Sequence, residues 1–424
     1  MQNNKQKSKN KKTSIDHFFS SYDKEGQNRI ELEDLLQVLK DQGLSQRDPR
    51  LKSFFSKTEQ MKRIKEITKE ELELLIQHQR PLFEKVFKEE LIIPEFKIFT
   101  QEITKIYDQV KKNQEGHVAD YIPQLKKISP DNFALSLCTL DGQSFSLGNS
   151  DQYFSLQSIS KTLNYCLALE DYGEKFVHDH VGREPSGHGF NEITLDKNKR
   201  PHNPFVNAGA IMINSMVRPD LEPAERFDHV MSMWEKSSAG EKTSFNNSVY
   251  LSERDSADRN FALAYFMKEN NSFPKNTDIL ETLEFYFRCC SIEHTTHAMS
   301  IFGATLANAG FCPLTNEKVF HPNTVKNCLS LMASCGMYDF SGEFFFSIGL
   351  PAKSGVGGGL LIVIPNLMGI CLWSPTLDHL GNSVKGIEFC KHLVSKYNFH
   401  NFDSLSTRHP GKTDPRLKRK GQKK

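Results

Sequence analysis

A serine and a lysine three residues apart stand at the start of an apolar segment of the chain. Ser158 and Lys161 precede Leu, Tyr and Cys residues at positions 163–169. In a helix, this spacing places both side chains on one face, at the positive end of the helix dipole. A partly desolvated lysine there has a lowered pKa and can accept the serine proton, while N–H groups at the helix end can hold an oxyanion. The pair therefore predicts a serine nucleophile activated by lysine, although a serine here is also typical of a helix cap.

A second motif, Lys353-Ser354-Gly355, directly precedes a glycine-rich run at residues 356–364 that is typical of a strand. Lys-Ser/Thr-Gly on an edge strand is a signature of the active-site-serine enzymes that recognise penicillin. Such a strand offers a backbone N–H opposite the nucleophile and a small residue beside which substrate can lie. Taken alone, the triplet is typical of a turn. Together with Ser158 and Lys161, it favours catalysis.

The domain that carries these motifs is preceded by a small helical module, predicted at residues 13–112. Its Lys, Glu, Leu and Phe residues show helical spacing, and the segment at 23–34 lies between two such stretches. This segment fits the calcium-loop pattern of an EF-hand in part. Its candidate ligands are Asp23, Glu25, Gln27 and Asp34. Because Asn28 stands where the loop needs Gly and Asp34 is shorter than the usual Glu, we expect an EF-hand-like shape without tight calcium binding.

The rest of the globular chain, residues 113–403, is predicted to be one α+β domain. Residues 133–147 alternate around Asp141-Gly142, which indicates a hairpin. Helical patterns fill residues 156–335, strands are expected at 344–348 and 360–373, and a helix is expected at 384–394. Strands at both ends of a domain predict an antiparallel sheet built from distant segments, with a helical subdomain between them. This layout matches the serine β-lactamase and penicillin-binding-protein architecture.

Composition indicates one large and one small globular domain with basic tails. The chain has 424 residues, 38% of them hydrophobic and 25% charged, which is enough apolar material for a sizeable core. The first 12 residues carry 5 Lys and no acidic residue, and residues 404–424 are also rich in Lys and Arg. We expect both segments to be disordered, solvated tails. We expect no nucleic-acid partner.

Cysteine usage and hydropathy bear on the compartment. The 9 Cys residues form no Cys-x-x-Cys pair and nearly all lie in apolar runs, which favours buried thiols inside the cell over disulfides or a zinc site. No apolar stretch reaches the roughly 18 residues that a membrane-spanning helix needs. The N-terminus has no hydrophobic signal region and no clear mitochondrial presequence.

Several long blocks of the sequence resemble the glutaminase family, which includes the kidney-type and liver-type animal enzymes and their bacterial relatives. The resemblance runs from about residue 23 to about residue 415. It is densest at residues 181–187, 202–210, 252–260, 335–342 and 352–375. It implies hydrolysis of L-glutamine to L-glutamate and ammonia, in glutamine catabolism and glutamate biosynthesis, on the β-lactamase-like fold and without a metal or organic cofactor.

The resemblance also implies the residues of the site. Four are expected to be catalytic: Ser158 as nucleophile, Lys161 as base or proton relay, Tyr286 beside the nucleophile and Tyr338 as proton shuttle. The expected substrate-binding residues are Tyr121, Ser158, Asn207, Glu253, Asn260, Tyr286, Tyr338 and the backbone of Val356. Glutamine is a zwitterion, so a carboxylate such as Glu253 suits its α-ammonium group, and amide and hydroxyl donors suit its α-carboxylate.

Departures from the family pattern concern regulation and assembly. The serine block reads Ser-Ile-Ser-Lys-Thr where animal members usually have Ser-Cys-Val-Lys-Pro. Glu192 and Thr194 stand where animal enzymes commonly have a basic residue and an apolar or small one. We therefore expect a homodimer or homotetramer without phosphate-driven polymerisation. We also expect no ankyrin repeats, and a location in mitochondria, as in the family, or in the cytosol.

Two alternatives remain. The first is a hydrolase acting on penicillin-like or peptidoglycan substrates. It would need a Ser/Tyr-x-Asn element, and the segment at Tyr286 has Arg288 in place of the Asn. The second is a calcium-responsive scaffold built on the helical module, and the degenerate loop argues against it.

Overall fold

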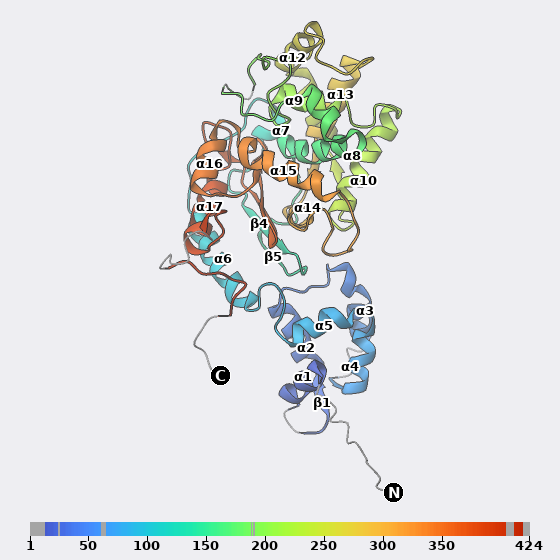
Figure 1. Ribbon diagram of the computed structural model, residues 1–424. Coiled ribbons are helices and arrows are strands. Elements are labelled where there is room, and N and C mark those ends of the chain that lie inside the picture. The colour runs from blue at the N-terminus through green and yellow to red at the C-terminus, as the bar shows by residue number, and fades with distance from the viewer. Residues whose placement is uncertain are drawn as a thin grey trace. The chain divides into compact units, whose positions relative to one another are not determined.

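The structure is a computed structural model that describes residues 13–23, 26–60, 65–187, 189, 191–403 and 411–418. It divides into two compact units (Figure 1). One comprises residues up to Phe99 and from Pro415 onward, and the other runs from Thr100 to Asp414. The boundary expected between residues 112 and 113 falls just after helix α6 (Phe96–Val110). The predicted N-terminal tail, residues 1–12, lies outside the described residues, as do residues 404–410 and 419–424 of the predicted C-terminal tail.

The smaller unit contains two helix–loop–helix motifs joined by paired strands. Helix α1 (Ser14–Tyr22) begins with a capping box, in which the Thr13 hydroxyl accepts from the Asp16 N–H and the Asp16 carboxylate accepts from the Thr13 N–H. Strand β1 (Arg29–Glu31) pairs antiparallel with β2 (Glu66–Thr68). The other helices of the unit are α2 (Leu32–Asp41), α3 (Lys52–Gln60), α4 (Lys69–Ile76) and α5 (Arg80–Phe87), with short 3₁₀ turns η1 (Pro49–Leu51) and η2 (Gln77–Gln79). Paired strands linking two such motifs give the expected EF-hand-like fold.

In the loop of the first helix–loop–helix motif, the Asp23 carboxylate is hydrogen-bonded to the backbone of the loop itself. Both oxygens of Asp23 accept backbone N–H groups, from Gln27 at 3.0 Å and from Asn28 at 2.9 Å. Asn28 has φ of 55°, a left-handed conformation that glycine adopts more readily. Glu25 lies outside the described residues. Among the residues that the structure describes, no group of three His, Cys, Asp or Glu side chains is arranged to hold a metal ion.

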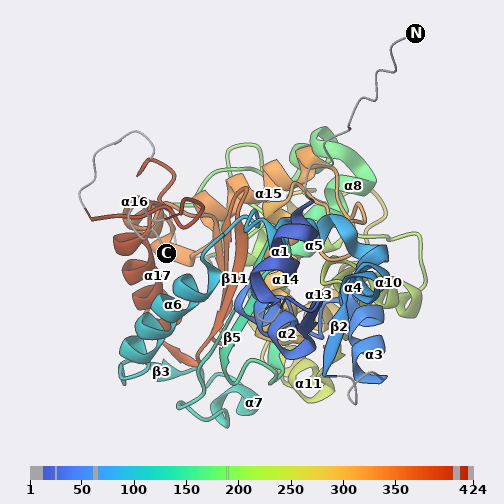
Figure 2. The same cartoon turned by 90° about the horizontal axis from the view of Figure 1, so that it is seen from below.

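The larger unit is built on a five-stranded antiparallel sheet in the order β5-β4-β11-β10-β9. The strands are β4 (Ala134–Thr139), β5 (Ser144–Gly148), β9 (Ala352–Ser354), β10 (Gly359–Ile364) and β11 (Met368–Trp373). Helix α14 (Thr296–Ala307) packs on one face of the sheet, and α6 and α17 (Val384–Lys396) cover the other (Figure 2). The inner strands β4, β10 and β11 are buried at every residue, as this double covering requires. Segments from both ends of the domain therefore form one sheet, as expected.

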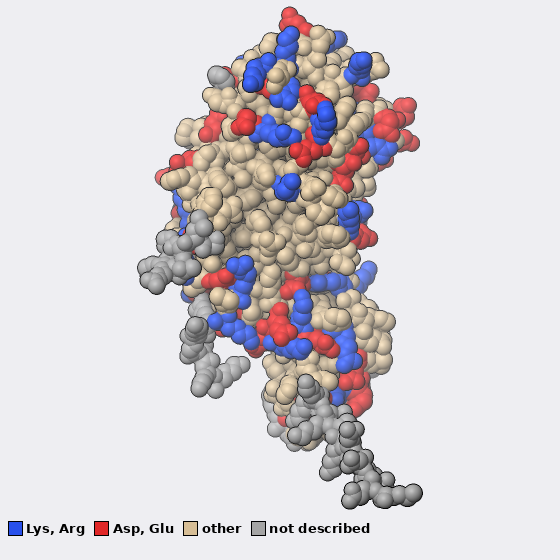
Figure 3. Space-filling model, in the orientation of Figure 1, with Lys and Arg blue, Asp and Glu red and all other residues tan. Residues whose placement is uncertain are grey.

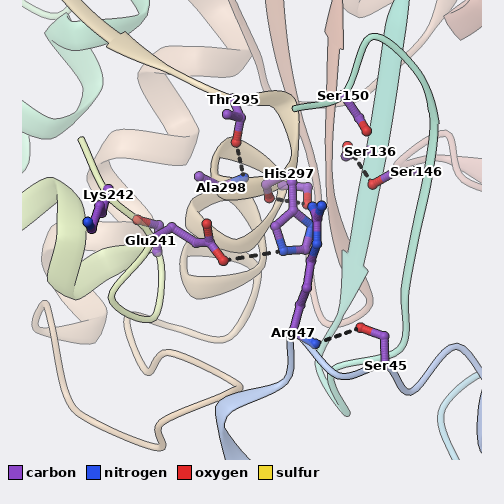
Figure 4. Close-up of polar contacts among 12 residues, drawn as sticks. Ser45, Arg47, Ser136, Ser146, Ser150, Glu241, Lys242, Thr295, His297 and Ala298 are labelled. Carbon is purple, nitrogen blue, oxygen red and sulfur yellow. Dashed lines mark hydrogen bonds and ion pairs between the residues drawn. The ribbon is translucent and has the colours of Figure 1, made fainter. Parts of the chain in front are cut away.

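Helix α14 lies close to the sheet because two glycines meet there. A Cβ atom on Gly369 of β11 would come within 2.3 Å of the Ala304 nitrogen, and one on Gly303 would come within 2.9 Å of the Gly369 Cα. The N-terminus of α14 is capped by Thr295, whose side chain accepts from the Ala298 N–H at 3.2 Å (Figure 4). The two glycines thus let α14 pack directly on β11, at the centre of the sheet.

A helical subdomain and a small three-stranded sheet complete the unit. The sheet has the order β6-β8-β7, formed by β6 (Phe154–Ser155), β7 (Ser244–Phe245) and β8 (Ile292–His294). The helices are α7 (Pro123–Lys126), α8 (Ser160–His180), α9 (Asn207–Asn214), α10 (Pro223–Ser237), α11 (Asn247–Asp255), α12 (Asp258–Glu269), α13 (Ile279–Cys290) and α15 (Pro322–Cys335). Strands β3 (His117–Val118) and β12 (Thr376–Leu377) form a separate pair. One large apolar core joins the subdomain to the main sheet.

The strand expected at residues 344–348 is wrong. Helix α16 (Ser341–Ser347) occupies most of this segment, after the 3₁₀ turn η4 (Tyr338–Phe340). Phe344 and Ile348 are buried while Phe346 is 82% exposed. Burial thus recurs every four residues, the helical period, and this packing outweighs the strand preference of consecutive Phe residues.

Hydropathy and surface charge can be followed over the part of the chain that the structure describes. Within the described ranges, no helix combines the length and hydropathy needed to cross a bilayer. On the face drawn in Figure 3, basic and acidic side chains are interspersed, with a broad uncharged area between them. The expected absence of a nucleic-acid partner stays a prediction.

Candidate active site

Ser158 lies in a short 3₁₀ turn, η3 (Gln157–Ile159), immediately before α8. Its side chain is partly exposed, whereas those of its neighbours in the turn are buried. Gln157 has φ of 49°, in the left-handed region that non-glycine residues rarely adopt. Strained backbone of this kind persists where the surrounding structure demands it and is concentrated at functional sites. The turn thus presents the Ser158 hydroxyl at the start of the helix.

Lys161 points into the protein from the first turn of α8. Its side chain is 2% exposed, and its Nζ donates to the Phe205 carbonyl at 3.2 Å and to Asn207 Oδ1 at 2.8 Å. Both acceptors are uncharged, so they do not compensate for the desolvation of an ammonium group. Burial accordingly lowers the pKa of Lys161 to about 8. A lysine with this pKa can exchange a proton near neutral pH.

Asn207, the first residue of α9, connects four polar side chains. Its Oδ1 accepts from Lys161 and, at 3.4 Å, from the Tyr286 hydroxyl. Its Nδ2 donates to Asn260 Oδ1 at 3.3 Å and to Asn191 Oδ1 at 3.1 Å. Burial raises the pKa of Tyr286 well above its ordinary value, so the phenol is a neutral donor. Residues from α8, α9, α12 and α13 therefore meet in one network.

Glu253 of α11 is hydrogen-bonded to the residue that precedes Ser158. Its Oε1 accepts from the Tyr121 hydroxyl at 2.6 Å and from Gln157 Nε2 at 3.0 Å. Burial raises the pKa of Glu253, and the hydrogen bonds from Tyr121 and Gln157 act in the opposite direction. Both donors are uncharged, so neither neutralises the carboxylate. The arrangement leaves a buried acidic group suited to a cationic ligand.

Tyr338 stands beside the nucleophile in the turn that precedes α16. Its backbone φ is 52°, so it shares the left-handed conformation of Gln157. Its side chain is 8% exposed. Burial raises the pKa of Tyr338, while hydrogen bonding with the Ser158 side chain and with the backbone of Val356 acts in the opposite direction. The phenol therefore lies between the serine hydroxyl and the strand segment that follows Lys353-Ser354-Gly355.

Lys353 and Ser354 lie on β9, the edge strand of the main sheet, as expected, and Gly355 directly follows that strand. Lys353 of β9 is fully buried, donates to the carbonyls of Gly336 and Ser354 at 3.2 and 2.7 Å, and lies 4.7 Å from the centre of the Tyr338 ring. Burial, and next the neighbouring Lys161, hold the pKa of Lys353 well below its usual range. A Cβ on Gly355 would lie 2.6 Å from the Leu156 carbonyl oxygen, so glycine lets this strand end approach the nucleophile turn.

All nine residues predicted for the site are brought together by these contacts. Gln157 and Asn191 were missed, and Lys353 was noted only as part of a motif. Gln157 is polar, buried and strained, which no local pattern reveals, because the partners that require it come from distant parts of the chain. Asn191 lies in a loop whose pairing with Asn207 depends on tertiary packing.

Two protein-family models match the chain. A glutaminase family model matches residues 116–402, and an EF-hand domain model matches residues 14–94. The two matches cover the larger and the smaller structural unit in turn.

Similar proteins carry the same description. Putative glutaminase 2 of Caenorhabditis elegans is 45% identical over 417 residues, covering 95% of this chain and 69% of the relative. The mitochondrial liver isoform of glutaminase from Mus musculus is 44% identical over 397 residues, covering 92% and 66%. Glutaminase of the cyanobacterium Nostoc is 42% identical over 304 residues, covering 72% and 90%. The chain thus spans about two thirds of the length of these animal relatives.

Solved structures show the same similarity in three dimensions. The probable glutaminase ybaS superposes with a TM-score of 0.66 at 36% identity, covering 69% of this chain and 94% of that one. Mglu in its glutamate form superposes with a TM-score of 0.67 at 33% identity, covering 71% and 68%. The architecture expected from the sequence, a β-lactamase-like domain preceded by an EF-hand-like unit, is confirmed.

Proposed function

Because the chain belongs to the glutaminase family, we propose that it hydrolyses the side-chain amide of L-glutamine to give L-glutamate and ammonia. The observation that carries this proposal is a pair of buried groups connected to the turn that holds Ser158. Lys161, whose pKa is about 8, follows this turn in α8, and the Glu253 carboxylate accepts from Gln157, the residue before Ser158, and from Tyr121. A base beside a nucleophile suits amide cleavage, and a free carboxylate suits an α-ammonium group.

The first half-reaction forms an ester on Ser158. Neutral Lys161 takes the hydroxyl proton as the serine oxygen attacks the carboxamide carbon. The tetrahedral oxyanion is held by the backbone N–H groups of Ser158 and Val356, donors that need no reorganisation as the charge develops. The carbon–nitrogen bond then breaks, and the leaving nitrogen takes a proton through Tyr338 or Lys161, so that ammonia departs. The product is a γ-glutamyl ester.

The second half-reaction returns the enzyme to its starting state. A water molecule attacks the ester carbon and gives up a proton to Lys161 or Tyr338, and the Ser158 oxygen leaves with a proton as L-glutamate is released. Tyr338 suits the relay because its raised pKa keeps the phenol protonated and able to donate. The chemistry uses only side chains and water, and we propose no metal or organic cofactor.

Substrate recognition divides between the two sides of the site. Glu253, with Tyr121 beside it, binds the α-ammonium group. Asn207, Asn260 and Tyr286 supply amide and hydroxyl donors for the α-carboxylate. Pairing both charges of the zwitterion is what makes its desolvation tolerable. Asparagine, one methylene shorter, cannot place its amide carbon at Ser158 while both ends are held.

Assembly and compartment follow from the same family membership. We propose a homodimer or homotetramer that phosphate does not drive further. A cavity of about 600 Å³ beside Tyr338 has Glu192 and Asp339 in its lining, and carboxylates disfavour an anion. All nine cysteines are buried free thiols, which supports a reducing compartment inside the cell. The mouse relative is mitochondrial by name, and mitochondria or cytosol are the proposed locations.

The test is ammonia release by purified protein from L-glutamine, L-asparagine and a chromogenic β-lactam, with and without phosphate. Steady release from glutamine alone is expected. Turnover of the β-lactam without release from glutamine would assign the serine site to penicillin-like substrates instead. If the protein reacts with none of the three compounds, the proposal is contradicted.

A further inference from the structure

A second cavity, of about 560 Å³, lies in the helical subdomain away from Ser158. Its lining comes from α8, the residues that follow α9, Arg226 of α10, and the start of α13 with the residues before it. Figure 1 shows these four helices together in the helical subdomain. Its volume falls within the range of roughly 300 to 1,000 Å³ that is typical of small-molecule sites. None of the nine proposed site residues lines it. The proposed glutaminase reaction gives this cavity no role.

One wall of the cavity is aromatic. Tyr172 and Phe176 of α8 stack with ring centres 4.9 Å apart and an interplanar angle of 21°. Phe176 and His180 continue the row, with centres 4.7 Å apart. All three rings line the cavity, and Tyr172 is 39% exposed. A row of rings open to a cavity favours a flat aromatic ligand, through stacked or edge-to-face contacts.

Three aliphatic hydroxyl groups of the cavity present acceptors rather than donors. Each gives its proton to a backbone carbonyl: Ser215 to Met212 at 2.7 Å, Thr277 to Pro274 at 2.9 Å and Thr282 to Asp278 at 2.6 Å. Because a hydroxyl has one proton, each is left with only lone pairs for a ligand. The carboxylates of Asp278 and Glu281, also in the lining, are acceptors as well.

The buried cation of the cavity is already engaged. Arg226 is 2% exposed and donates to the carbonyls of Val217 and Asn214 and, at 3.1 Å, to the Glu281 carboxylate. Its guanidinium also lies 4.0 Å from the centre of the Phe285 ring. Three of its five donors are therefore used within the protein. A ligand that itself carries donors therefore fits the acceptors of these walls, and Lys275 is the other Lys or Arg side chain in the lining.

We propose that this cavity binds a planar heteroaromatic molecule bearing amino or ring N–H groups, and that its occupant alters turnover at Ser158. The rings of Tyr172 and Phe176 take its apolar faces and edges, and the lone pairs of Thr282 and Ser215 take its N–H groups. Such a molecule is about the size of an aminopurine. A flat hydrocarbon would leave the acceptors without partners, which costs binding free energy.

The cavity and the active site share two helices. Thr282 lines the cavity, and Tyr286, which hydrogen-bonds Asn207, lies four residues further along α13, on the same helical face. Ser215 directly follows α9, the helix that begins with Asn207. A ligand that shifts the start of α13 or the end of α9 would therefore act on the Asn207 network around Lys161.

Adenosine is the probe, and purine riboside, which lacks only the 6-amino group, is its matched control. Binding to the full chain is measured by isothermal titration calorimetry, which does not depend on the proposed activity. Adenosine is expected to bind more tightly than purine riboside, by about threefold or more, the size of one hydrogen bond. Failure of adenosine to bind at millimolar concentration, or equal binding of the two nucleosides, would overturn the proposal.

Substitutions test whether adenosine binds in this cavity. Tyr172→Ala is expected to weaken adenosine binding at least about fivefold, while Tyr172→Phe retains it, since the stacked ring remains. Tyr265→Ala removes a comparably exposed ring outside the cavity and should change nothing. Thr282→Val should abolish the preference for adenosine over purine riboside. Wild-type binding by Tyr172→Ala would place the probe elsewhere and refute the site.

Kinetics test the coupling. Saturating adenosine is expected to change kcat or KM for glutamine in the wild-type protein and in Tyr265→Ala, but not in Tyr172→Ala at the same concentration. Basal activity of all three is expected to be equal, because these residues lie outside the active site. Binding that leaves both constants unchanged would refute the coupling through α9 and α13.

Discussion

The Nζ atom of Lys161 lies 2.8 Å from Oδ1 of Asn207, and no carboxylate takes part in that contact. An amide oxygen carries no net charge, so it orients Lys161 while stabilising the ammonium form less than a carboxylate would. Asn207 also accepts from Tyr286 and donates to Asn260. One amide thereby fixes the base beside Ser158 and links it to the expected carboxylate-binding residues.

Replacing Ser158 with alanine is expected to abolish glutamine hydrolysis and leave the fold intact. The hydroxyl is partly exposed, so its loss removes little packing. Ammonia release measures activity, and the midpoint of thermal unfolding reports the fold. Retention of more than a few per cent of the activity by a folded Ser158→Ala protein would remove Ser158 from the nucleophile role.

The pH dependence of kcat/KM is expected to follow Lys161. Since the pKa of Lys161 is about 8, the amine is mostly protonated below that pH and cannot take the serine proton. kcat/KM should therefore rise with pH and level off above about 8. Lys161→Ala should lose nearly all activity at every pH. If that variant instead recovers at moderately high pH, the lysine is an electrostatic helper rather than the base.

Glu253→Gln is expected to lower kcat/KM for glutamine. The substitution keeps shape and hydrogen bonding but deletes the charge proposed to pair with the α-ammonium group. Removing one partner of a desolvated ion pair costs about 3 to 5 kcal/mol, on the order of 10² to 10³-fold. An analogue without the α-amino group should show a far smaller loss.

Measuring both substrates on both proteins completes a double-mutant cycle. Equal losses on glutamine and on the analogue would mean that Glu253 supports the structure of the site through Tyr121 and Gln157. The recognition of the amino group would then have to be assigned to other residues.

Assembly is expected to be independent of phosphate. Light scattering should give a dimer or tetramer whose mass stays constant when phosphate is added, because Glu192 lies in the lining of the cavity beside Tyr338. Glu192→Lys reverses this charge and should increase any response to phosphate. Strong phosphate-induced polymerisation of the unaltered protein would contradict the prediction.

Stability is expected to fall between pH 6.5 and pH 3 because of His294. Burial, and next the neighbouring His297, lower its pKa to about 3 from an ordinary value of 6.5. Within this window the unfolded chain binds a proton that the folded protein does not, so the free energy of unfolding decreases as the pH falls. One such group contributes up to about 1.4 kcal/mol per pH unit. Urea unfolding at several pH values measures the slope.

The structure around His294 provides the control. Its Nε2 lies 3.2 Å from the Thr243 hydroxyl and 3.5 Å from that of Ser238, and the nearby His297 faces Glu241 at 3.6 Å (Figure 4). His294→Gln retains a hydrogen-bonding side chain and should flatten the slope by about one proton. His379→Gln makes the same substitution at an exposed histidine and serves as the control for removing a histidine from the chain. An unchanged slope in His294→Gln would assign the acid sensitivity to other groups.

Local patterns in the sequence were sufficient for several elements of the fold. The hairpin of β4 and β5 follows from alternation around Asp141-Gly142, and the Ser158 turn with Lys161 follows from their spacing before an apolar helix. These patterns work because they depend on residues close together in the chain. The nine site residues came from ordered blocks shared with a family, which carry information about contacts that spacing alone cannot supply.

The tertiary structure decided what depends on distant partners. Residues 344–346 have strand-forming side chains, yet their packing gives a helix. Gln157 and Lys353 belong to the site only because α11 and Tyr338 lie against them. Burial in the folded protein lowers the pKa of Lys161 to about 8. Burial also raises the pKa of Glu253, whose hydrogen-bond donors Tyr121 and Gln157 are uncharged. Desolvation depends on how the core is folded. The sequence therefore identifies the reactive groups, and the fold determines their pKa values.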